Sequence, residues 1–81
     1  MNVRVRMFAA LRQAVGSDRV EVALPDGATI GHLRRRLAEQ FPQLSKSTAL
    51  VMFAIDTQYA DDGARIPPGA DVACIPPVSG G

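Results

Sequence analysis

The sequence predicts an α+β fold in which one main helix packs on a mixed β-sheet. Several short segments alternate apolar and polar side chains, which is the period of a β-strand. Between them, residues 30–41 carry an apolar stripe at helical spacing. The chain has 81 residues, 47% of them hydrophobic and only 5% aromatic, which is typical of a single domain with one aliphatic core.

The first quarter of the chain is expected to run strand, helix, strand. Residues 2–8 alternate apolar and basic side chains and predict a strand. Residues 9–15 are mostly good helix formers and end at Gly16, a typical C-cap, so a short helix or helical turn should follow. Residues 20–24 alternate again. The two strands should therefore be antiparallel neighbours.

The main helix is predicted to begin after Thr29, an N-capping residue, and to end at Pro42. The face of this helix that carries the basic run 34–36 is expected to lie in water, with docking of an acidic partner as the alternative. The stripe that should pack on the sheet consists of Ile30, Leu33, Leu37, Ala38 and Phe41.

The pattern of residues in the second half of the chain predicts three further strands. Residues 50–55 are apolar at nearly every position, which indicates a buried strand. A turn at 56–57 leads to a short edge strand, 58–60, and residues 71–75 are apolar on both faces, as central strands usually are. If the first and last strands lie side by side, the helix covers one face of the sheet in a ubiquitin-like β-grasp. Periodicity alone leaves open a two-layer sandwich with another strand order.

Composition disfavours several classes of function. Nine basic and eight acidic side chains give a net charge of +1, so no nucleic-acid partner is expected. No apolar run approaches the roughly 20 residues of a membrane span, and a signal-peptide pattern is absent, which predicts a cytoplasmic protein with no membrane partner. One Cys and one His cannot build a metal site unaided, so neither a metal nor a bound cofactor is expected.

Individual reactive side chains favour structural roles. Cys74 lies in an apolar strand without a cationic neighbour and is expected to be a buried thiol. His32 is expected at the boundary of the helix, and Asp61 and Asp62 in a turn rather than an acid–base pair. Because no nucleophile, base and oxyanion site can be assembled, the chain is not expected to be catalytic alone.

Residues 76–81, Pro-Pro-Val-Ser-Gly-Gly, are predicted to form a flexible tail behind a domain of residues 1–75. Two prolines end the sheet ladder, and Gly80 and Gly81 lack Cβ atoms, so the tail suits a narrow passage in another protein. A carboxylate is a poor electrophile and must be activated elsewhere, most simply as an acyl-adenylate made from ATP. Sulfur could then displace AMP and leave a thiocarboxylate. A frayed end without function is the alternative.

Two segments resemble the small subunit of molybdopterin synthase, the MoaD-type sulfur carriers. Residues 73–81 match the family's apolar-apolar-Pro-Pro-Val-Ser/Thr-Gly-Gly ending, and residues 8–16 are similar to its Phe-Ala-x-x-Arg-x-x-x-Gly segment. The resemblance implies a ubiquitin-like β-grasp and adenylation of Gly81 by an E1-like enzyme that uses ATP. It further implies a C-terminal thiocarboxylate that donates sulfur to cyclic pyranopterin monophosphate in the large subunit of a heterotetramer.

By the same resemblance, Gly81 is the sulfur-carrying residue and Gly80 belongs to the same reactive end. The chain would be one half of a two-component sulfurtransferase. Contacts to the large subunit are then assigned to Phe8, Arg12, Ile75, Pro76, Pro77, Val78 and Ser79. From its pattern alone, Phe8 fits the core as well as an exposed anchor.

Three other functions stay open from the sequence. The same chemistry serves carriers for thiazole, cysteine or tRNA thiolation. Protein conjugation through an isopeptide bond from Gly81 uses the same activated intermediate. A different class is an interaction module whose strand edge pairs with a partner and whose tail is passive.

Overall fold

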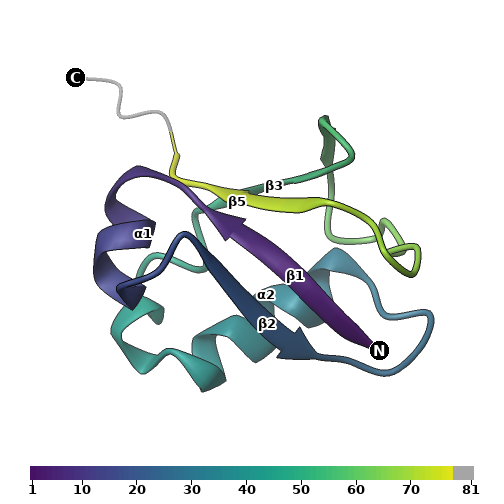
Figure 1. Ribbon diagram of the computed structural model, residues 1–81, viewed down its shortest axis with the longest axis horizontal. Coiled ribbons are helices and arrows are strands. Elements are labelled where there is room, and N and C mark those ends of the chain that lie inside the picture. The colour runs from purple at the N-terminus through teal and green to yellow at the C-terminus, as the bar shows by residue number, and fades with distance from the viewer. Residues whose placement is uncertain (78–81) are drawn as a thin grey trace.

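A five-stranded mixed sheet with the order β2-β1-β5-β3-β4 forms the centre of the molecule (Figure 1). The structure is a computed structural model that describes residues 1–77. The strands are β1 (Asn2–Met7), β2 (Arg19–Ala23), β3 (Met52–Ile55), β4 (Gln58–Ala60) and β5 (Val72–Ile75). The helices are α1 (Ala9–Val15), α2 (Ile30–Gln40) and a short 3-10 helix (Pro42–Leu44).

The first and last strands lie side by side in the middle of the sheet. β1 pairs in parallel with β5, with Met7 opposite Cys74, and in antiparallel fashion with β2. β3 pairs antiparallel with the other side of β5, with Met52 opposite Ile75. This order confirms the β-grasp expectation over the alternative strand order.

The two helices begin and end where the sequence indicates. Thr29 Oγ1 accepts a hydrogen bond from the backbone N–H of His32 at 3.3 Å, which caps α2. Gly16 takes the left-handed conformation, with φ 76°, and its N–H donates to the carbonyl of Arg12 at 2.9 Å. This αL cap ends α1 and turns the chain toward β2.

The core lies between α2 and one face of the sheet. Ile30, Leu33 and Leu37 are completely buried, whereas Ala38 and Phe41 are partly buried at its margin. Burying one such aliphatic side chain contributes roughly 1.5–3 kcal/mol. The sheet residues that are most deeply buried are Val5, Val22, Phe53, Val72 and Cys74. In Figure 1, α2 crosses this face, and the opposite face of the sheet carries no helix.

Two expectations about burial are wrong. The segment 50–55 is not buried throughout, because Leu50 is 66% exposed and Met52 is 40% exposed. Only one face of the sheet is covered by a helix, and Met52 lies on the uncovered face, whereas the next residue, Phe53, points into the core. Arg34, expected in water, is instead drawn against the protein, where its guanidinium donates to the backbone carbonyls of Thr48 and Val51 at 2.7 and 2.8 Å.

Candidate functional site: the root of the C-terminal segment

Three elements meet where β5 ends. The parallel pairing of Met7 with Cys74 brings Phe8, just after β1, to the same edge of the sheet as Ile75. The antiparallel pairing of Met52 with Ile75 adds the start of β3. Figure 1 shows the end of β5 beside the start of α1. We call this group the tail root; it consists of Phe8, Met52, Ile75, Pro76 and Pro77.

The tail root exposes apolar surface. Phe8 and Met52 are each 40% exposed, Ile75 and Pro76 are half-buried, and Pro77 is exposed. Exposed apolar side chains that gather at one place usually mark a surface that another molecule covers. Phe8 is therefore an exposed side chain and not a core residue, which decides between its two predicted placements.

The helix-free side of the sheet, which we call the outer face, continues from the tail root. The strand registers place Ala73 beside Arg6 and Ala54, and Tyr59 beside Ala54. The two alanines are nearly buried, at 5% and 7% exposure, whereas Tyr59 is 70% exposed. The outer face therefore has a flat centre of small side chains, with Arg6 on one side and Tyr59 on the other.

Charged side chains surround Phe8. The Nε and Nη2 atoms of Arg6 donate to Oδ1 and Oδ2 of Asp71 at 2.9 and 2.8 Å. The guanidinium carbon of Arg6 lies 5.5 Å from the centroid of the Phe8 ring. Arg12, on α1, is 3.6 Å from the carboxylate of Asp18 and stays largely exposed. A shallow hollow between these groups is lined by Arg6, Met7, Phe8, Arg12, Ser17, Asp18 and Arg19.

The structure brings together part of the set that the sequence proposed. The tail root contains four of them, Phe8, Ile75, Pro76 and Pro77. Arg12 is exposed on the adjacent helix α1. The roles proposed for these residues stay predictions. Val78, Ser79, Gly80 and Gly81 lie outside the described residues, as does most of the predicted tail, so the reactive end also remains a prediction.

Sequence reasoning missed two features of this surface. Met52 belongs to the tail root, but its segment looked uniformly apolar and carried no alternation that would mark an exposed face. The Arg6–Asp71 pair joins residues 65 positions apart, which only the register of β1 and β5 brings into contact. The alternation of arginines along β1 was the one available signal, since it indicated an outward side for Arg6.

The thiol of the single cysteine is in an environment that keeps it unreactive. Cys74 is 1% exposed and belongs to the core. Burial raises the pKa of the Cys74 thiol from 9.0 to about 12, and the positive charge of Arg34 offsets only part of that rise. The thiol therefore stays protonated near neutral pH, as a buried structural thiol should.

The other side chains considered for chemistry are those of His32, Asp61 and Asp62. His32 is half-buried in the first turn of α2. The carboxylate of Asp61 accepts a hydrogen bond from the backbone N–H of Gly63 at 3.1 Å, within the turn that follows β4. The carboxylate of Asp62 pairs with Arg34, so each of the two carboxylates has its own partner. Residues 1–77 contain no cluster of three or more His, Cys, Asp or Glu side chains that could hold a metal ion. None of the helices in this range is long and apolar enough to span a membrane.

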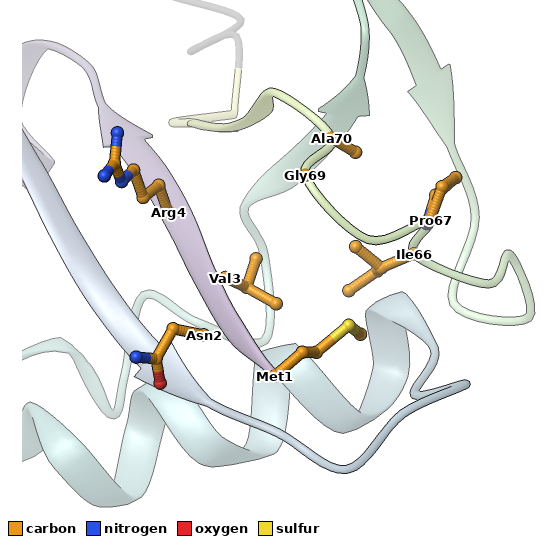
Figure 2. A pocket seen from close by; sticks show the side chains of 8 residues that line it. All are labelled: Met1, Asn2, Val3, Arg4, Ile66, Pro67, Gly69 and Ala70. Carbon is orange, nitrogen blue, oxygen red and sulfur yellow. The ribbon is translucent and has the colours of Figure 1, made fainter.

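A second hollow lies at the far end of β1. Figure 2 shows Met1, Val3 and Ile66 reaching toward it, while the side chains of Asn2 and Arg4 point away. Val3 and Ile66 already belong to the hydrophobic core. Because β1 and β5 are parallel, this hollow is at the opposite end of the sheet from Ile75 and takes no part in the tail root.

Comparison with known proteins places the chain in a family. A family model described as the ThiS family matches residues 5–81. The chain is 36% identical to a molybdopterin synthase sulfur carrier subunit of Caenorhabditis briggsae, over 100% of this chain and 99% of the relative.

Two solved structures share the fold. SAMP1 from Haloferax volcanii, a small archaeal modifier protein, has a TM-score of 0.84 at 27% identity, with 100% of each chain covered. A chain in the complex of subunits 1 and 2 of molybdopterin-converting factor from Helicobacter pylori has a TM-score of 0.68 at 20% identity, with 100% of each chain covered. At that identity, the second likeness shows the fold alone. The chain therefore belongs to the ThiS family, in the group that contains the molybdopterin synthase sulfur carrier subunits.

Proposed function

We propose that the chain is the sulfur carrier subunit of a molybdopterin synthase. The observation that carries the proposal is the position of Pro76, the residue with which the Pro-Pro-Val-Ser-Gly-Gly ending begins. It follows directly from β5, the central strand, at an edge where Phe8 and Met52 are exposed. A partner that covers this edge would also be within reach of Gly81, since four extended residues span about 13 Å at most.

The proposed chemistry takes place at Gly81 and in partner proteins. In an E1-like enzyme, a carboxylate oxygen of Gly81 attacks the α-phosphate of ATP, and pyrophosphate leaves. A sulfur nucleophile then attacks the acyl carbon and displaces AMP, which leaves a thiocarboxylate. That sulfur is finally donated to cyclic pyranopterin monophosphate in the active site of the large subunit. The folded body supplies recognition, and it holds no cofactor.

The surroundings of Cys74 support a carrier whose reactive sulfur sits at its C-terminus. Cys74 is the one cysteine of the chain, and its buried thiol has a pKa of about 12. It is therefore a poor nucleophile and a poor target for electrophiles near neutral pH. A thiocarboxylate on Gly81 would not compete with a second accessible thiol of the same chain.

The partner that receives the sulfur is proposed to be the large subunit, in a heterotetramer. The name of the Caenorhabditis briggsae relative describes a subunit of a larger synthase. The Helicobacter pylori complex joins subunits 1 and 2 of its molybdopterin-converting factor. Burial of the exposed tail-root side chains would remove apolar surface from water and so favour such a complex.

The proposal is tested by the intact mass of the chain after incubation with ATP, a sulfide source and an E1-like enzyme. We expect a gain equal to sulfur replacing oxygen, followed by its loss when the large subunit and cyclic pyranopterin monophosphate are added. The Cys74→Ala variant should show the same gain, and a chain without Gly81 should show none. Sulfur transfer by the chain that lacks Gly81 would overturn the proposal.

A second candidate is protein modification, which the likeness to SAMP1 favours. In that case the activated Gly81 acylates a lysine amine, and an isopeptide bond forms. Recovery from the host of lysine-linked adducts of the chain would support this function. Carriers for thiazole, cysteine or tRNA thiolation would form the thiocarboxylate but would not pass sulfur to cyclic pyranopterin monophosphate.

A further inference from the structure

We infer that Arg6 and Asp71 are positioning residues that hold the Phe8 side chain in its docking orientation. The large subunit would then meet a preformed aromatic anchor beside the tail. This inference rests on the proposed function, in which Phe8 contacts the large subunit, and it adds two residues that do not themselves need to touch the partner.

One edge of the Arg6 guanidinium, formed by Nε and Nη2, is held by the carboxylate of Asp71. Two nearly parallel hydrogen bonds of 2.9 and 2.8 Å join its guanidinium to the carboxylate of Asp71. Such a bidentate pair restricts orientation as well as distance. Asp71 is itself held, because its backbone N–H donates to Asp56 Oδ1 at 2.9 Å and its carbonyl accepts from the N–H of Asp56 at 2.8 Å. The guanidinium is thereby tied to the end of the β3–β5 ladder.

Phe8 is constrained from two sides. Its backbone is extended, with φ −114° and ψ 149°, and its carbonyl accepts a hydrogen bond from Leu11 at 3.1 Å. The next residue, Ala9, has φ 51°, an uncommon left-handed conformation for a residue with a Cβ. On the side-chain side, the guanidinium of Arg6 lies over the ring at 5.5 Å. A cation at this distance from a ring centroid is attracted to its face.

A fixed anchor binds more tightly because less conformational freedom is lost in the complex. Ordering one mobile side chain at an interface lowers affinity by a factor of about 2 to 10. Without the guanidinium, the 40% exposed Phe8 ring would have no cation over its face. The expected cost of losing Arg6 is therefore a loss of affinity that depends on the presence of Phe8.

Arg4 provides a matched control. It lies two residues before Arg6 on the same face of β1, and its guanidinium is 3.5 Å from the carboxylate of Glu21. It therefore also belongs to an exposed ion pair, but its partner is on β2 and not beside Phe8. Loss of an exposed pair by itself has little effect on folding or on binding elsewhere.

The test is a double-mutant cycle on the full chain, with the dissociation constant for the large subunit measured by calorimetry. We expect Arg6→Ala to weaken binding about fivefold and Asp71→Asn about twofold to threefold, within the range for one ordered side chain. Arg4→Ala should stay within about twofold of the unchanged chain. In a Phe8→Ala background, Arg6→Ala should cause no further loss.

Two outcomes would overturn the inference. One is unchanged binding by both Arg6→Ala and Asp71→Asn. The other is an equal loss with and without Phe8, which would mean that Arg6 touches the partner directly. Urea denaturation of each variant shows whether it is folded, and Asp71→Asn provides the milder test if Arg6→Ala is unstable. If the unchanged chain itself fails to bind the large subunit, the proposed function fails as well. If the chain binds and the Arg6→Ala substitution does not change the affinity, only the positioning role is contradicted.

Discussion

Arg34 donates two hydrogen bonds to a single carboxylate oxygen of Asp62, from Nε at 3.1 Å and from Nη2 at 2.8 Å. Its Nη1 donates to the carbonyls of Thr48 and Val51, and its guanidinium lies 5.1 Å from the ring centroid of Phe53. One side chain of α2 thus joins the turn after β4 to the segment before β3. This network positions the start of β3, which contributes Met52 to the tail root.

Replacing Arg34 with alanine should lower the free energy of unfolding by about 2–3 kcal/mol, because two partly buried carbonyls lose their donors and Asp62 loses its counter-ion. The urea midpoint, with an unchanged slope, is the measurement. Arg35→Ala, on the exposed side of the same helix, should change the stability by no more than about 0.5 kcal/mol. Equal effects of the two substitutions would contradict this account of Arg34.

Cys74 should make stability fall at high pH. Its pKa is about 12 in the folded chain and near 9 when unfolded, so between these values the folded state retains a proton that the unfolded state loses. The contribution is complete below about pH 9 and is lost as the pH rises toward 12. One pKa unit corresponds to about 1.4 kcal/mol, so the total is on the order of a few kcal/mol.

The measurement for Cys74 is the urea midpoint between about pH 8 and pH 11, compared with a Cys74→Ala variant. All other titrating groups are shared, so the difference in slope reports Cys74 alone. We expect the variant to be less stable near neutral pH and to depend less on alkaline pH. Parallel pH profiles for the two proteins would show that the buried thiol does not resist ionisation.

Thr57→Gly should stabilise the chain by about 0.5–1 kcal/mol. Thr57 has φ 72° and follows Asp56 at φ 48°, so the β3–β4 turn places two residues with a Cβ in the left-handed region. Turns of this kind favour glycine, particularly over a β-branched residue. Thermal unfolding is a suitable measurement. Ala60→Gly, in the adjoining strand β4, should destabilise instead, and stabilisation by both substitutions would argue against relief of strain at Thr57.

Met52→Glu should weaken binding to the large subunit at least tenfold while leaving the fold intact. The side chain is 40% exposed beside Ile75, so a carboxylate is tolerated in the free protein but would be desolvated in the complex. Affinity measured by calorimetry and stability measured by urea denaturation separate the two effects. Arg35→Glu on α2, on the opposite side of the sheet, should leave the affinity nearly unchanged. A similar loss in both variants would place the interface elsewhere.

Local patterns were sufficient for most of the fold. Alternation in β1 and β2, the Thr29 cap and the apolar stripe of α2 report directly which side chains are buried, so they predicted the elements and their limits. The apolar character of residues 72–75 on both faces also indicated a central strand, and β5 is indeed the middle strand of the sheet. Periodicity, however, leaves the order of the strands open. The proline and glycine content of residues 76–81 likewise singled out the ending, although that prediction lies mostly outside the described residues.

The tertiary structure decided which apolar and charged side chains face outward and which distant residues meet. Met52 is apolar by sequence and exposed in the fold, because periodicity cannot tell which face of a sheet a helix will cover. By sequence, Arg34 belongs to a basic run that is expected in water. In the fold, its guanidinium donates hydrogen bonds to Thr48, Val51 and Asp62. The Arg6–Asp71 pair depends on the register of two strands at opposite ends of the chain. Such contacts are set by packing across the whole domain, which no local pattern of residues encodes.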